Sequence, residues 1–179
     1  MSHRFFVVTG GPGAGKTSLI RELARRGVQT APESGRAVIR EEQARGGTAL
    51  PWGDRLAYAM RMLERDLTGH ASAGAGTGPV VFDPGVPDVL GYLALCGLDV
   101  PEKVARVARE TRYNPTVFFA PYWGEIFTQD AERRQDRAEA MATAEIMAET
   151  YARLGYQIVE LPRADIAARA EFVLARLHG

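Results

Sequence analysis

One short segment constrains this chain more than any other. Residues 10–17 read GGPGAGKT, which fits the pattern G-x-x-x-x-G-K-[ST]. The nearly continuous apolar run of residues 4–9 precedes the segment, and Leu19, Ile20 and Leu23 follow it at the spacing of one helix face. Glycines between a strand and a helix let successive backbone N–H groups turn toward an anion, and the positive end of the helix dipole adds to that site. The sequence therefore predicts a phosphate-binding loop.

Lysine is rare in this chain, in which only Lys16 and Lys103 are lysines among 22 basic residues. Lys16 lies in the predicted loop, where its ammonium group would neutralise the β- and γ-phosphates of a nucleotide, and the Thr17 hydroxyl would ligate Mg²⁺. We therefore expect ATP and Mg²⁺ as cofactors, with the choice between ATP and GTP left open. The predicted nucleotide-binding residues are Gly10, Gly11, Gly13, Ala14, Gly15, Lys16, Thr17 and Ser18.

Strand-like and helix-like patterns alternate along the chain. This alternation predicts an α/β fold of the P-loop NTPase type, a single domain over residues 1–179 with about five parallel strands, helices on both faces and the proportions of a small kinase. A low-complexity stretch at residues 71–78 is expected to be a flexible loop. The predicted strands cover residues 4–9, 28–31, 79–83, 116–120 and 157–161, and the predicted helices cover residues 16–26, 33–45, 56–67, 86–96, 102–111, 131–154 and 165–177.

Composition excludes several classes of function. The 22 basic and 22 acidic residues give a formal net charge of zero, which argues against nucleic acid as a partner. Cys96 is the one cysteine, so an internal disulfide and a cysteine-based zinc site are excluded. No apolar run approaches the roughly 20 residues of a membrane span. We expect a cytoplasmic protein that binds small molecules, and the sequence does not fix its oligomeric state.

A second acidic element follows the predicted strand at residues 79–83. The apolar run ends in Asp83, which would lie at the carboxyl end of its strand and hold Mg²⁺ together with Thr17. An aspartate before Pro84 is also common in ordinary turns, so the pattern gains its meaning from the phosphate loop. Asp88 is either a second carboxylate of the acceptor site or a helix cap, and the sequence leaves both interpretations open.

A charged segment follows the fourth predicted strand. Within residues 122–138 we expect a lid, because Arg133 and Arg137 are four residues apart and would share a helix face directed at the transferred phosphoryl group. The competing interpretation is a solvated helix whose Asp130 and Arg134 form an ordinary surface pair.

Several further segments carry a resemblance to a known family. Beside the loop at residues 10–17, these are the segments at residues 32–39, 82–88, 91–92, 130–133 and 151–156. Over nearly its whole length the chain resembles a family of compact P-loop proteins labelled an AAA domain. That family is related to the ribosylnicotinamide-kinase half of bacterial NAD-biosynthesis regulators and, more distantly, to nucleoside and nucleotide kinases.

The resemblance implies an ATP- and Mg²⁺-dependent kinase for a small hydroxyl acceptor that is nucleoside-like or nucleotide-like. It implies that Glu33 and Arg36 face the acceptor, where Glu33 would take the hydroxyl proton or bind a ribose-like diol and Arg36 would hold an anionic group. The competing interpretation is a glutamate that favours the start of a helix and an ordinary surface arginine. Lys16 and Asp83 would join Glu33 as catalytic residues, and the two lid arginines would close over the site.

One departure from the family pattern bears on catalysis. The family usually has Asp-Arg-Gly where this chain has Asp83-Pro84-Gly85, and proline supplies neither a charge nor an N–H group. Either Arg112 or Arg133 substitutes for the missing arginine, or phosphoryl transfer is impaired. The alternative function is therefore a nucleotide-binding regulatory module with slow or no NTP hydrolysis.

Overall fold

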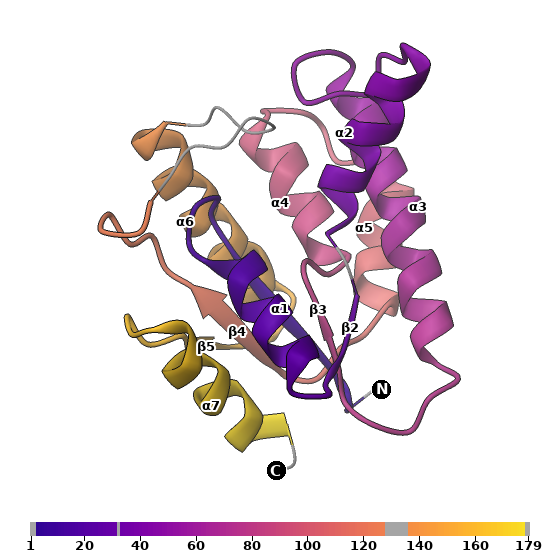
Figure 1. Ribbon diagram of the computed structural model, residues 1–179. Coiled ribbons are helices and arrows are strands. Elements are labelled where there is room, and N and C mark those ends of the chain that lie inside the picture. The colour runs from indigo at the N-terminus through magenta and orange to yellow at the C-terminus, as the bar shows by residue number, and fades with distance from the viewer. Residues whose placement is uncertain (1–2, 32, 128–135, 178–179) are drawn as a thin grey trace.

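The predicted α/β architecture is present. The computed structural model describes residues 3–31, 33–127 and 136–177. Within them, five parallel strands form one sheet in the order β2-β3-β1-β4-β5 (Figure 1). The strands are β1 (Phe5–Gly10), β2 (Gln29–Ala31), β3 (Val80–Phe82), β4 (Thr116–Ala120) and β5 (Gln157–Glu160).

Helices cover both faces of the sheet (Figure 1). On one face lie α1 (Lys16–Arg25) and α7 (Ile166–Leu177). On the other lie α2 (Ser34–Arg45), α3 (Arg55–Ala73), α4 (Pro87–Leu95), α5 (Glu102–Glu110) and α6 (Arg137–Arg153). No helix in the described part of the chain is long and apolar enough to cross a membrane.

The central strand β1 holds the two halves of the core together. All six of its residues are buried. Because side chains alternate along a strand, Phe5 and Val7 pack in the cluster beneath α2–α6, while Phe6 and Val8 pack in the cluster beneath α1 and α7. Burial on both faces explains why the sequence of this strand is a continuous apolar run and not an alternating one.

The strand order places the ends of β2, β3 and β1 side by side. The connection after β1 leads to one side of the sheet and the connection after β3 leads across β1 to β4 on the other side. Ligands of open α/β sheets bind at such switch points, outside the carboxyl ends of the strands. Glu33, Asp83 and the phosphate loop follow β2, β3 and β1, so they lie along one edge of the sheet.

The predicted loop at residues 71–78 begins later than expected. Helix α3 continues through Ala73, which is buried in the core, because alanine is the strongest helix former and this alanine packs inward. The Arg4 guanidinium donates hydrogen bonds to the carbonyl oxygens of Ala73, Gly74 and Gly78 and thereby ties both ends of the remaining loop to the sheet.

The predicted helix at residues 131–154 also has a different start. Helix α6 begins at Arg137, because Asp136 is extended and forms a capping box with Glu139. The Glu139 N–H donates to the Asp136 carboxylate at 2.9 Å, and the Asp136 N–H donates to the Glu139 carboxylate at 3.0 Å. Residues 128–135 of the predicted lid lie outside the described residues, and Arg133 is among them.

Candidate active site

The glycine-rich segment forms a tight connection between β1 and α1. Gly15 is the N-cap of α1 and has a φ of 76°, a left-handed conformation that glycine adopts without steric strain. Gly11 approaches α6 so closely that an added Cβ atom would clash with the carbonyl oxygen of Ala140. The segment therefore needs glycine at these positions for its shape, independently of any ligand.

The Lys16 ammonium group lies within the curve of this loop. Its Nζ atom donates hydrogen bonds to the carbonyl oxygens of Gly10 at 2.9 Å and Gly11 at 2.6 Å. The first turn of α1 contains no acidic residue, so nothing on that turn offsets the positive helix terminus. A cation and a helix N-terminus at one loop are the two features that favour binding of a phosphate group, so the predicted role of this loop fits its geometry.

Arg169 of α7 contacts the phosphate loop, a role that was not predicted from the sequence. Its side chain on α7 is 3% exposed, and its Nη1 atom donates to the carbonyl oxygen of Ala14 at 3.0 Å. Burial lowers the pKa of its guanidinium group. A signal was present, because Arg169 shares the helical spacing of the buried residues Ala170, Val173 and Leu177.

Asp83 and Thr17 are the two predicted ligands of Mg²⁺. Asp83 is 3% exposed at the carboxyl end of β3, whose neighbour in the sheet is β1, and Thr17 is half-buried in the first turn of α1. No group of three or more His, Cys, Asp or Glu side chains in the described residues forms a closed metal site. This donor set fits Mg²⁺, which is typically bound by one or two protein oxygens together with phosphates and water.

Asp88 is the shared acceptor of several buried hydrogen bonds that connect β1 and α6. Its carboxylate accepts hydrogen bonds from the Thr9 hydroxyl at 2.5 Å, from the Gly85 N–H at 3.2 Å and from the Tyr151 hydroxyl. Burial raises the pKa of Asp88, and the hydrogen bonds from Thr9, Tyr151 and Gly85 oppose that shift. The bond from Gly85 resembles a helix cap, while the other two bonds join distant parts of the chain. The predicted role of Asp88 toward an acceptor stays a prediction.

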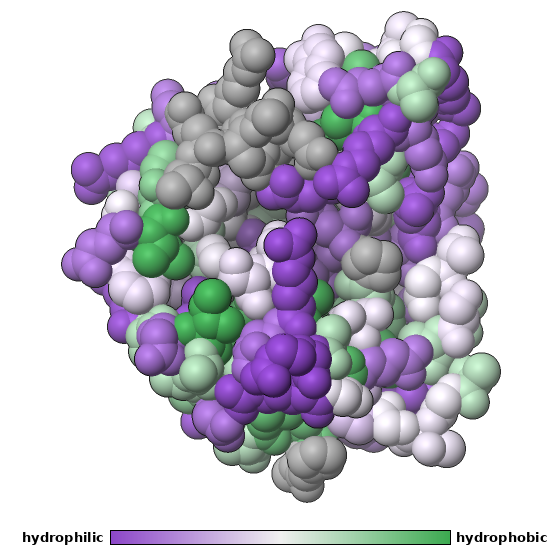
Figure 2. Space-filling view, in the orientation of Figure 1, coloured by the Kyte–Doolittle hydropathy of each residue, from purple (hydrophilic) through white to green (hydrophobic). Residues whose placement is uncertain are grey.

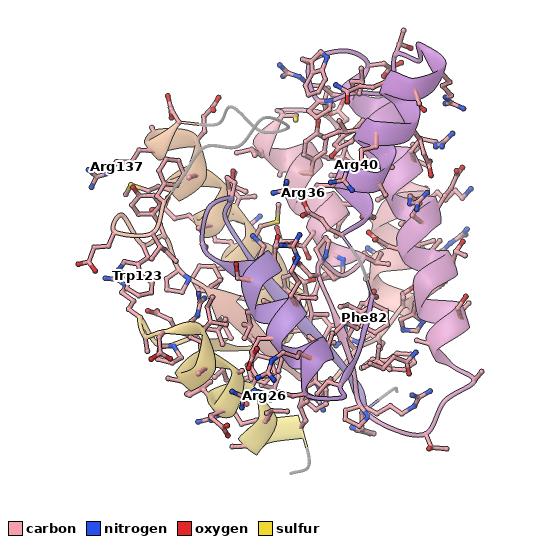
Figure 3. All side chains as sticks on the ribbon, viewed as in Figure 1. Arg26, Arg36, Arg40, Phe82, Trp123 and Arg137 are labelled. Carbon is pink, nitrogen blue, oxygen red and sulfur yellow. The ribbon has the colours of Figure 1, made fainter. Side chains whose placement is uncertain are left out.

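Glu33 and Arg36 meet at the start of α2. The Arg36 Nε atom donates to the Glu33 carboxylate at 2.8 Å, and both side chains are partly buried. Figure 3 shows Arg36 on the side of α2 nearer the phosphate loop, whereas Arg137 points outward from the start of α6. The Arg137 guanidinium lies 5.6 Å from the centre of the Tyr122 ring. The structure thus brings Glu33 and Arg36 to the sheet edge but turns Arg137 away from it.

Asp66 and Ser34 are two further polar residues that the sequence reading missed. Asp66 lies on the buried face of α3, four residues after Met62 and eight after Tyr58. An apolar side chain is expected at this position of an amphipathic helix. Ser34 is the first residue of α2 and is 4% exposed. The sequence could have indicated Asp66, because it is a charged residue at a position where the helical spacing of apolar residues predicts burial.

Comparison with known proteins identifies the same architecture elsewhere. A search of curated proteins finds no significant match. Among solved structures, deoxyadenosine kinase from M. mycoides with products dCMP and a flexible dCDP bound matches with a TM-score of 0.69 at 12% identity, covering 97% of this chain and 98% of the kinase. Shikimate kinase from Acinetobacter baumannii in complex with shikimate matches with a TM-score of 0.53 at 16% identity, covering 99% of this chain and 92% of that enzyme.

A third solved structure, the NadR protein in complex with NR, matches with a TM-score of 0.66 at 20% identity, covering 98% of this chain and 50% of NadR. These structures have the fold of P-loop kinases, and at such identities they establish the fold alone. The family model described as an AAA domain matches residues 5–169. The chain therefore belongs to the AAA domain family defined by that model.

Proposed function

We propose that this protein is an ATP- and Mg²⁺-dependent phosphotransferase that acts on a nucleoside-like or nucleotide-like hydroxyl acceptor. The observation that carries the proposal is the alignment of three groups along one sheet edge: the Lys16 loop after β1, Asp83 after β3 and the Glu33–Arg36 pair after β2. A nucleotide half and an acceptor half of a kinase site would then meet at the switch point of the sheet.

In the proposed reaction the acceptor hydroxyl oxygen forms a bond to the γ-phosphorus of ATP. The bond from that phosphorus to the oxygen bridging the β- and γ-phosphates breaks, and ADP leaves with the bond electrons. The Glu33 carboxylate accepts the hydroxyl proton, and Arg36 orients both Glu33 and the acceptor. Lys16 stabilises charge on the phosphoryl oxygens.

Magnesium would be held by Thr17 and Asp83, whose oxygen donors fit it. When bound, the ion supplies charge neutralisation and orientation of the phosphates. The protein holds the phosphate loop in shape, partly through the hydrogen bond that Arg169 donates to the carbonyl oxygen of Ala14.

The proposal is tested by ATP consumption in the presence of a panel of nucleosides, nucleotides and sugars. We expect at least one acceptor to stimulate turnover at least tenfold over the rate without acceptor. ATP binding without stimulation by any acceptor would instead favour the alternative, a nucleotide-binding regulatory module. That alternative is motivated by Pro84, which supplies neither a charge nor an N–H group beside Asp83.

A further inference from the structure

A buried carboxylate lies where the pairing of β1 with β3 ends. The register of these two strands stops at the pair Val7–Phe82, whereas β1 stays paired with β4 as far as Gly10. The last residues of β1 lead into the phosphate loop, and Asp83 directly follows β3. Beyond the last pair, backbone pairing between strands of the described chain no longer holds the phosphate loop to the segment that carries Asp83.

The side chain of Asp88 connects these two segments instead. Its Oδ1 atom accepts a hydrogen bond at 2.5 Å from the hydroxyl of Thr9, which directly precedes Gly10. Its Oδ2 atom accepts a hydrogen bond at 3.2 Å from the N–H group of Gly85, which lies two residues after Asp83. One carboxylate thus joins the end of the strand before the phosphate loop to the turn after Asp83.

Helix α6 contacts both of the connected segments. The Tyr151 hydroxyl donates a further hydrogen bond to Asp88 and lies so close to Gly85 that an added Cβ atom would clash with it. Nearer the start of the helix, the carbonyl oxygen of Ala140 would clash with a Cβ atom at Gly11 of the phosphate loop. The turn and the loop therefore pack against one helix, and Asp88 lies at the point where all three elements meet.

Burial makes the hydrogen bonds of Asp88 hard to replace. Figure 2 shows hydrophilic side chains gathered along α2 and α3 on the outer surface, where water solvates them. Asp88, in contrast, is 8% exposed, and Thr9 and Tyr151 are fully buried. Burial raises the pKa of Asp88, while the bonds from Thr9, Tyr151 and Gly85 and the charge of Lys16 lower it. Loss of one partner in such a place leaves a polar group that water does not satisfy.

We propose that Asp88 is a positioning residue, whose carboxylate holds the turn after Asp83 against the phosphate loop so that Asp83 and Thr17 bind one Mg²⁺. The inference rests on the proposed function and adds a residue to its metal site. Because both oxygens of Asp88 are bonded within the protein, Asp88 acts through Asp83 and the loop and not by contact with the acceptor. Residues that orient metal ligands in this way affect metal affinity nearly as strongly as the ligands do.

The test is calorimetric binding of a non-hydrolysable ATP analogue, measured once with Mg²⁺ and once with EDTA. The ratio of the two dissociation constants is the factor by which Mg²⁺ tightens binding, and for the wild type we expect at least about tenfold. Asp88→Asn puts an amide N–H₂ group where one carboxylate oxygen accepts hydrogen bonds. It should reduce the Mg²⁺ factor by at least about fivefold, while the affinity in EDTA changes by less than about threefold.

A pair of variants at Thr9 tests the same bridge from the side of the phosphate loop. Thr9→Val removes the hydroxyl group at nearly the same volume and should also reduce the Mg²⁺ factor, whereas Thr9→Ser keeps the hydroxyl and should preserve it. The control is Val104→Ala, which removes buried apolar volume from α5 and leaves the hydrogen bonds of Asp88 in place. This control should lose stability and keep the Mg²⁺ factor. If Asp88→Asn does not fold, the comparison of the two Thr9 variants decides.

Three results would overturn the inference: no Mg²⁺ factor in the wild type, an unchanged factor in Asp88→Asn or Thr9→Val, or an equal loss in Val104→Ala. These measurements need no acceptor, so they stand apart from phosphoryl transfer. Acceptor phosphorylation by the wild type, together with an unchanged Mg²⁺ factor in the variants, would refute this inference alone. A lost Mg²⁺ factor in the variants, without phosphorylation of any acceptor by the wild type, would refute the proposed function alone.

Discussion

Replacing Asp66 by asparagine should change the pH dependence of stability. Burial disfavours the charged form of Asp66 and raises its pKa to about 8 in the folded protein, from an ordinary value of 3.8. Between these values the unfolded chain has lost this proton and the folded chain keeps it. The free energy of unfolding therefore falls as the pH rises from about 4 to about 8 and is unaffected by this group at higher pH.

The size of this effect follows from the shift. Each pKa unit corresponds to about 1.4 kcal/mol, so a shift of about four units lowers the unfolding free energy by at most about 6 kcal/mol. Asp66→Asn does not ionise, and its stability relative to wild type should therefore increase by up to about 1.4 kcal/mol per pH unit across this range. For a chain of this length, 1 kcal/mol moves the Tm by about 2–4 °C.

The assay is denaturant unfolding of both proteins at pH 5, 6.5, 8 and 9. Other titrating groups are common to the two proteins, so they cancel in the difference. Any constant effect of burying an amide cancels as well, because the test is the slope with pH and not the sign at one pH. Asp99→Asn, at an exposed position, is the matched control. A pH-independent difference between Asp66→Asn and wild type would refute the reasoning.

Three further substitutions probe the loop and its supports. Gly11→Ala should lower the unfolding free energy by about 1–3 kcal/mol because the new Cβ meets a carbonyl oxygen of α6, whereas Gly69→Ala, with open space around it, should not destabilise; equal denaturation midpoints would contradict this. Tyr151→Phe leaves Asp88 short of one buried hydrogen bond and should lower stability by about 1–3 kcal/mol in the same assay; an unchanged midpoint would refute it. Arg169→Met should weaken ATP binding in calorimetry while the thermal transition stays cooperative, and unchanged affinity would exclude a supporting role.

The sequence was most informative where local pattern and tertiary structure agree. The phosphate loop could be located because its glycines, lysine and flanking apolar residues are adjacent in the chain. Strand β4 was predicted with its observed bounds, since a buried parallel strand is a short apolar run. The start of α6 was predicted too early although its signal was readable: Asp136 and Glu139 have the spacing of a capping box.

Long-range contacts account for what the sequence could not supply. The hydrogen-bond partners of Asp88 come from Thr9, 79 residues away, and Tyr151, 63 residues away, so no local pattern announces them. Asp66 could have been recognised as an anomaly on an apolar helix face, but its raised pKa depends on packing against α2 and the sheet. Periodicity identifies such a position, whereas its chemistry follows only from the three-dimensional structure.

In the proposed function, the Lys16 loop serves transfer of a phosphoryl group to a small acceptor. The most direct measurement follows label from γ-labelled ATP into the acceptor with Mg²⁺ present, for wild type, Lys16→Ala and the exposed control Lys103→Ala. We predict labelled acceptor with wild type and Lys103→Ala, and at least about 100-fold less with Lys16→Ala, in line with loss of a transition-state charge contact. Label found only in inorganic phosphate, or equal transfer by Lys16→Ala, would contradict the account.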